Sequence, residues 1–99
     1  MTTKIRRSKD NVFRDLGFDA AESENLRLRS DLMIELSKLI QSRRLTQAKA
    51  AAMFGVSQPR VSDLVRGRID RFSVDTLVAM LGHAGLSVRL VVKPRPRVA

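Results

Sequence analysis

Apolar residues recur at helical spacing through the second quarter of the chain. They come every three or four positions and lie on one face of a helix: Leu28, Leu32, Met33, Leu36, Leu39 and Ile40. This periodicity predicts an amphipathic helix that ends near Gln41. Asp19, followed three residues later by Glu22, has the pattern of a capping box and predicts where the helix begins. Ser30 and Asp31 could interrupt it, so one long helix and two shorter ones both fit the pattern.

A second pattern, over residues 46–67, predicts two short helices joined by a tight turn. Thr46 and Ser57 stand where an N-cap hydroxyl would accept a free amide of the first turn. Gly55 and Gly67 stand where each helix would end, and glycine readily adopts the left-handed conformation needed there. This is the layout of a helix-turn-helix, in which the second helix reads the DNA major groove.

The rest of the sequence predicts one more helix and one strand. Ser73 is a candidate N-cap for a helix over residues 73–84. Residues 86–92 alternate well enough to predict a strand. The segment 11–18 is ambiguous: it could be a brief strand, or a loop that packs its apolar side chains on the domain, namely Phe13, Leu16 and Phe18.

These elements indicate a mainly α fold, a compact four- to five-helix domain with a short C-terminal β-strand. The 99 residues suffice for one domain, which we expect over residues 11–92. Only 4% of the residues are aromatic, so the core should be aliphatic. We expect residues 1–10 to form a flexible basic N-terminal arm and residues 93–99 a basic tail.

Charge is unevenly distributed along the chain. The net charge is +9, yet residues 10–35 carry seven acids and three bases, a balance of −4. Residues 43–71 carry seven bases and two acids, a balance of +5. The positive charge therefore centres on the predicted helix-turn-helix, where it would attract a polyanion such as DNA.

The sequence offers no candidate for catalysis or metal binding. It contains no cysteine, and its single histidine, His83, has no second histidine to act with. No phosphate-binding glycine loop and no nucleophile constellation is present. We therefore expect a protein that is not an enzyme, with no catalytic residues, no metal and no cofactor. The apolar runs are too short to span a bilayer, which predicts a soluble cytoplasmic protein without membrane contact.

The helix-turn-helix segment resembles the lambda-repressor-like (Cro/XRE) family. The matching residues are Thr46-Gln47, Ala50-Ala51, Gly55-Val56-Ser57, Val61-Ser62, Leu64 and Gly67. The longer arrangement, with residues 11–18 before the helices and the valine-rich segment 86–92 after them, is similar to the HigA-type antitoxin branch. This resemblance implies a lambda-repressor-like fold. It also implies a protein that represses its own operon and neutralises a small toxin, typically a ribosome-dependent messenger-RNA endonuclease.

The candidate DNA-contacting residues lie in and around the second helix of the motif: Arg43, Arg44, Gln47, Ser57, Gln58, Pro59, Arg60, Ser62, Asp63, Arg66 and Arg68. Gln58 is the main candidate base reader, because an amide can both donate to and accept from adenine. Pro59 suits a helix start better than contact with a thymine methyl. Arg60 could pair with guanine or clamp a phosphate. Asp63, one turn on with Ser62, could accept from cytosine or orient Arg60 or Arg66.

The arginines at and beyond the end of this helix are expected to hold phosphates: Arg66, Arg68 and Arg71. Such contacts supply affinity without sequence information. Arg43 and Arg44 could do the same or face water. The family resemblance implies that Gln47 grips a phosphate and braces the recognition helix.

Two protein interfaces are also predicted. One helix reads only a few base pairs, so useful specificity implies a homodimer on a palindromic operator in double-stranded DNA. The candidate dimer contacts lie on the strand: Leu86, Val88, Leu90 and Val92. Residues 12–16 of the same chain are an alternative partner for this strand. The acidic segment 10–28 would suit a small basic toxin, or could simply cover the core; its candidate contacts are Val12, Phe13, Leu16 and Phe18.

The favoured function is a sequence-specific DNA-binding repressor that is also the antitoxin of a toxin–antitoxin pair. It would be bacterial, cytoplasmic and nucleoid-associated when bound. Two alternatives stay open: a stand-alone XRE-type phage or chromosomal regulator without a toxin, and a toxin-binding inhibitor with little affinity for DNA.

Overall fold

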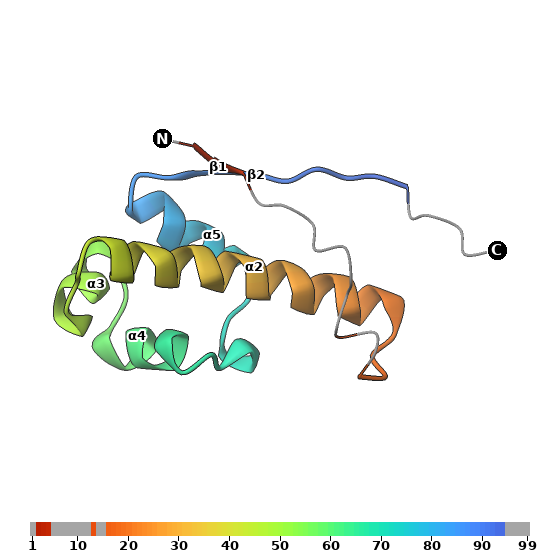
Figure 1. Cartoon of the computed structure of the whole chain (residues 1–99), viewed down its shortest axis with the longest axis horizontal. Coiled ribbons are helices and arrows are strands. Elements are labelled where there is room, and N and C mark those ends of the chain that lie inside the picture. The colour runs from red at the N-terminus through yellow and green to blue at the C-terminus, as the bar shows by residue number, and fades with distance from the viewer. Residues whose placement is uncertain (1, 5–12, 14–15, 95–99) are drawn as a thin grey trace.

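Helices dominate the computed structural model, which describes residues 2–4, 13 and 16–94. The elements follow in the order β1 (Thr2–Lys4), α2 (Ala20–Ser42), α3 (Gln47–Phe54), α4 (Gln58–Val65), the 3₁₀ turn η1 (Ile69–Arg71), α5 (Val74–His83) and β2 (Ser87–Arg89). The long helix α2 crosses the middle of the molecule, with α3 and α4 below it and α5 and the strands above it in Figure 1. The predicted mainly α fold is confirmed.

Helix α2 is one uninterrupted helix of 23 residues. It begins as predicted, since the Asp19 carboxylate accepts the Glu22 backbone amide at 2.8 Å. Asp31 does not interrupt it, because Arg27, one turn earlier, donates to the Asp31 carboxylate at 2.9 Å. This pair keeps the aspartate from competing for backbone amides. Burial raises the pKa of the Asp31 carboxyl, and Arg27 opposes the rise.

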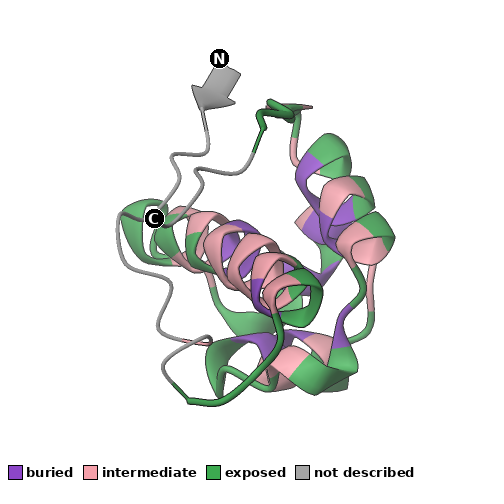
Figure 2. Cartoon of the chain, turned by 90° about the vertical axis from the view of Figure 1, so that its right-hand side faces the viewer, coloured by how far each residue is buried: buried purple, intermediate pink, exposed green. Residues whose placement is uncertain are grey.

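The core forms where the apolar faces of the helices meet, as the buried positions in Figure 2 show. From the predicted stripe on α2, Leu32, Met33 and Leu36 are buried, while the other three residues are half-buried and packed against the core. Most of the core is aliphatic, as the composition predicts. Two phenylalanines, Phe54 and Phe72, are nonetheless among its largest fully buried side chains.

The predicted helix starts and stops are confirmed. Three hydroxyl caps each accept the backbone amide three residues later: Thr46 from Lys49 at 3.1 Å, Ser57 from Arg60 at 3.4 Å and Ser73 from Thr76 at 3.1 Å. Gly55 and Gly67 have left-handed φ angles of 67° and 72°. Each cap stabilises its helix by about 1 kcal/mol. This matters most for α3 and α4, which have only eight residues each.

The C-terminal strand is shorter than predicted and has a different partner. Only Ser87–Arg89 of the predicted segment 86–92 is a strand, and it pairs in parallel with Thr2–Lys4. Most of the alternative partner, residues 12–16, lies outside the described residues. The pairing gives the backbone groups of Thr2–Lys4, in the basic arm, hydrogen-bond partners. The composition of the arm did not predict them. The rest of the arm and most of the tail lie outside the described residues.

Two described side chains of the segment before α2 are less buried than the loop interpretation predicts. Leu16 is 73% exposed and Phe18 is 42% exposed. The Phe18 ring instead contacts Phe13 edge to face, with 6.3 Å between the ring centroids. Two apolar side chains therefore stand at the surface near the start of α2.

A side chain from α5 lies against the turn between α3 and α4. The His83 ring lies so close to Gly55 that a Cβ there would stand 3.1–3.2 Å from the ring atoms. Around Gly67, by contrast, nothing lies within 4 Å of such a Cβ. The two left-handed glycines thus differ in their surroundings and not in backbone conformation.

Gly55→Ala should therefore destabilise the protein more than Gly67→Ala. Each substitution should cost about 1–2 kcal/mol of unfolding free energy through left-handed strain. Gly55→Ala should cost about 0.5–1 kcal/mol more, because the new Cβ makes the His83 ring shift by a few tenths of an ångström and strains its χ angles. Denaturant unfolding measures both costs. In a His83→Ala background the extra cost should vanish; an unchanged difference would show that the ring does not restrict Gly55.

Candidate nucleic-acid interface

Helix α4 turns one face inward and the opposite face to solvent. Val61 and Leu64 are buried and hold the helix against its neighbours, including α3 and α2. With 100° between successive residues, Pro59 and Arg66 lie opposite this pair, and Ser62 and Asp63 lie about 50° to either side of that direction. Pro59 and Arg66 are exposed and Ser62 is half-buried. This outward face is the part of α4 that can enter a groove of DNA.

Gln58 lies at the first turn of α4 and is exposed. In a helix-turn-helix the N-terminal residues of the second helix contact base edges. Ser57 caps the helix and Pro59 stands in its first turn, so the backbone that carries Gln58 is fixed by both neighbours. The structure therefore places the predicted base reader where reading is geometrically possible.

Arg60 is held against the protein and does not extend freely into solvent. It is half-buried, and its guanidinium donates to the Arg71 carbonyl oxygen at 2.8 Å. The same guanidinium lies over the Phe72 ring, with Cζ 5.5 Å from the centroid. An arginine in this position has its planar face and one donor already engaged.

Asp63 faces the loop after α4. Its carboxylate oxygens lie 3.9 Å from Arg68 Nε and 3.9 Å from Arg71 Nη1. The prediction that it orients an arginine is supported, but the expected partners, Arg60 and Arg66, were wrong. Asp63 lies on the flank of α4 that faces η1, so the loop arginines are nearer to it.

The other predicted phosphate contacts are spread over two exposed segments. Arg66 and Arg68, like Arg71, are exposed beside the end of α4. Arg43, Arg44 and Gln47 are exposed where α2 passes into α3, and they form a second group: Arg43 donates to the Met53 sulfur at 3.8 Å, and Arg44 has a φ of 50°. The chain thus presents cationic side chains at two separate places in the motif.

Sequence reasoning missed Arg29. This half-buried side chain of α2 donates to the Ile69 carbonyl at 3.1 Å and the Phe72 carbonyl at 3.4 Å. Its position, next to the apolar stripe but outside it, was the only signal in the sequence. The partners lie 40 and 43 residues further along, so no local pattern could identify them.

Other kinds of site find no support in the part of the chain that the structure describes. Among those residues, no three His, Cys, Asp or Glu side chains form a group that could hold a metal ion. No helix described is both long and apolar enough to cross a membrane.

Comparison with known proteins identifies the family. The model of a family described as a helix-turn-helix domain matches residues 12–93, and the chain belongs to that family. A solved structure described as an XRE-family transcriptional regulator is 33% identical, with a TM-score of 0.69. The match covers 79% of this chain and 88% of that one. No curated protein matches the chain.

The class of protein follows from these findings. The chain is a DNA-binding transcriptional regulator with an XRE-type helix-turn-helix, in which α3 is the first helix and α4 the recognition helix.

Asp63→Asn should strengthen binding to DNA of every sequence by about two- to five-fold, because it removes a negative charge near the phosphates and releases Arg68 and Arg71. Titration of two unrelated duplexes with wild-type and variant protein measures this. Asp70→Asn, at an exposed acid of η1, is the matched control for charge alone. Weaker binding at one cytosine-containing position only would instead show that Asp63 reads a base.

Proposed function

We propose that the protein represses its own operon by binding a palindromic operator as a homodimer, and that it is the antitoxin of a toxin–antitoxin pair. The observation that carries the first part is the outward face of α4, with Gln58 exposed at its first turn and arginines at its end. The HigA-like arrangement of residues 11–92 supports the second part.

The need for a dimer follows from the size of α4. An eight-residue helix reaches a few base pairs, and two copies of it would read half-sites about one helical turn apart. Leu86 and Val88 are half-buried and pack on this chain's own core. Leu90 is 53% exposed and Val92 is 95% exposed. Of the predicted dimer contacts, these last two have the apolar surface to offer a second subunit.

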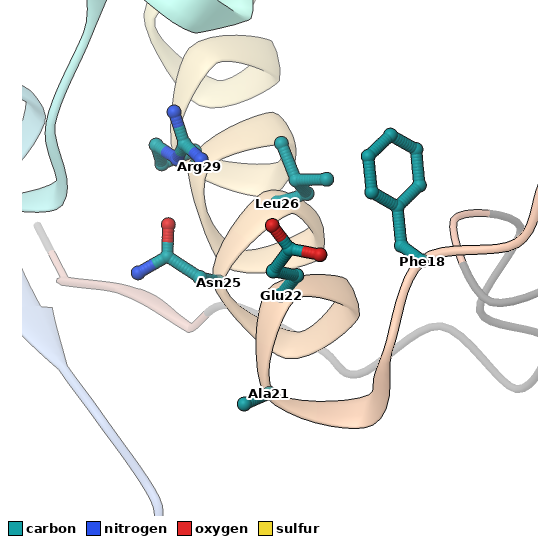
Figure 3. Close-up of a pocket in the computed structure, with 6 residues that line it drawn as sticks. All are labelled: Phe18, Ala21, Glu22, Asn25, Leu26 and Arg29. Atoms are coloured by element: carbon teal, nitrogen blue, oxygen red, sulfur yellow. The ribbon is translucent and has the colours of Figure 1, made fainter.

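The toxin would bind at the start of α2. A pocket of about 380 Å³ lies there, lined by Phe18, Ala21, Glu22, Asn25, Leu26 and Arg29. Figure 3 shows Phe18 beside the helix, with Glu22 and Leu26 on the side nearest to it. The exposed apolar side chains Leu16 and Phe18 stand next to acidic ones in an otherwise basic protein. This combination suits a basic protein that places an apolar side chain beside a lysine or arginine. Val12, the fourth predicted contact, lies outside the described residues.

A stand-alone regulator without a toxin is the second candidate function. It is favoured by the solved relative, which is described only as a transcriptional regulator. The two functions share the same DNA interface and differ in whether the surface at the start of α2 has a partner.

Gln58→Ala should abolish discrimination at one base pair of each half-site. The expected loss is about ten-fold or more in the ratio of binding to preferred and substituted sites, because a bidentate amide contact is lost. Binding of duplexes selected from a random library, with each base pair then varied, measures the ratio. Gln41→Ala, at the exposed end of α2, is a control. Two subunits per duplex are expected, and unchanged discrimination would contradict the role of Gln58.

The proposal expects a small basic protein to be encoded beside this gene, and Phe18→Ala and Glu22→Gln should each weaken its binding by about ten-fold, since each removes one part of the surface. Calorimetry on the purified pair measures the affinity. Ile34→Ala, exposed on α2, and Asp75→Asn, an acid in the first turn of α5, are matched controls. Failure of any such neighbour to bind the wild-type protein would favour the stand-alone regulator.

A further inference from the structure

The loop that follows the recognition helix is held by two arginines from opposite sides. From α2, Arg29 donates to the carbonyls of Ile69 and Phe72 at 3.1 and 3.4 Å. From α4, Arg60 donates to the carbonyl of Arg71 at 2.8 Å. Three of the four carbonyls from Ile69 to Phe72 thus accept from a guanidinium.

Phe72 lies between these two contacts. Its ring is buried, and the Arg60 guanidinium covers one face of it at 5.5 Å. Hydrogen bonds from a charged donor are roughly twice as strong as neutral ones. The Arg29 Nε is buried without a partner in the described structure, a cost that the two hydrogen bonds of its Nη1 must offset. The loop is therefore fixed by interactions that are stronger than its short 3₁₀ turn alone provides.

Arg60 also lies away from the outward face of α4. Its guanidinium is turned back to the loop by its contacts with the Arg71 carbonyl and the Phe72 ring. A helical projection alone does not separate it from Gln58, which lies at a similar angle on the other side of that face. Asp63, three residues on, shares its flank and lies 3.9 Å from Arg68 and from Arg71. Both charged residues of this flank therefore contact the loop.

We infer that Arg60 and Arg29 together are a loop clamp, and that Arg60 is a positioning residue which contacts no base. The clamp holds the segment 68–72 so that the exposed side chains of Arg68 and Arg71 meet phosphates in a fixed register with α4. Sequence is then read by Gln58 and the outward face of α4. This inference rests on DNA reading by α4.

Arg29 makes the test possible, because it is half-buried on α2 and holds the same loop through the Ile69 and Phe72 carbonyls. We would compare wild type with Arg60→Ala, Arg29→Ala, Gln58→Ala and Arg68→Ala. Each protein is titrated with the library-selected duplex and with all its single base-pair variants at several salt concentrations. Hydrogen exchange of the amides in residues 68–72 is measured on the free proteins.

A loop clamp predicts that Arg60→Ala and Arg29→Ala behave alike. Both should weaken binding of every duplex by about ten-fold and reduce the salt slope by about one, as Arg68→Ala should, because a phosphate contact is lost. Base discrimination should stay as in wild type and change only in Gln58→Ala. Exchange in residues 68–72 should be faster in both arginine variants, while α3 keeps its protection.

Two results would overturn the inference. Loss of discrimination at one base pair in Arg60→Ala, with Arg29→Ala unchanged, would make Arg60 a base reader. Unchanged exchange in residues 68–72 in both variants would show that the arginines do not hold the loop. If the wild-type protein selected no sequence from the library, the proposed operator binding would fail, and the exchange measurement would still test the clamp. If Arg60→Ala proved unfolded, Arg60→Lys would replace it. Arg29→Ala alone and Arg29→Ala combined with Arg60→Lys would then supply the same comparison.

Discussion

The recognition helix α4 is too short to be stable by itself, and everything that the protein does with DNA depends on how it is held. It has eight residues and only two buried side chains, Val61 and Leu64. A helix of this length is marginal in water, so its conformation comes from packing and from its ends. The Ser57 cap, the Gly55 turn and the Arg60 contact with the following loop supply what two apolar side chains cannot. Each also limits how α4 can be turned toward a groove.

The long helix α2 contributes to both surfaces that the protein is proposed to use. Its middle packs Leu32 and Leu36 into the core, and Arg29 reaches the loop after α4. Its beginning carries acidic residues beside exposed Phe18 and Leu16. An anionic surface would repel DNA, whereas the arginine-rich end of α4 attracts it. The two proposed surfaces differ in charge and meet at Arg29, which lines the pocket at the start of α2 and also holds the loop after α4.

The sequence was most informative where structure is local. Caps such as Ser57, the turn at Gly55 and the stripe that buries Leu32 are encoded within a few neighbouring positions, and these predictions are confirmed. The partner of β2 was not predictable, because Thr2–Lys4 has no apolar pattern and gains its order from backbone pairing 85 residues away. The contacts that hold the loop behind the DNA interface were not predictable either, because they join residues that no local pattern links. Arg60 is an ordinary basic residue of the motif until its contact with Arg71 is known.

The central claim is that α4 and the loop after it form the surface that meets DNA. The most direct test is to map backbone amide shifts by NMR as the protein binds its selected duplex. We expect the largest shifts in residues 57–62 and 68–71, with smaller ones around Gln47 and no change at the start of α2. Shifts confined to the start of α2 or to β2, with α4 unaffected, would contradict the account.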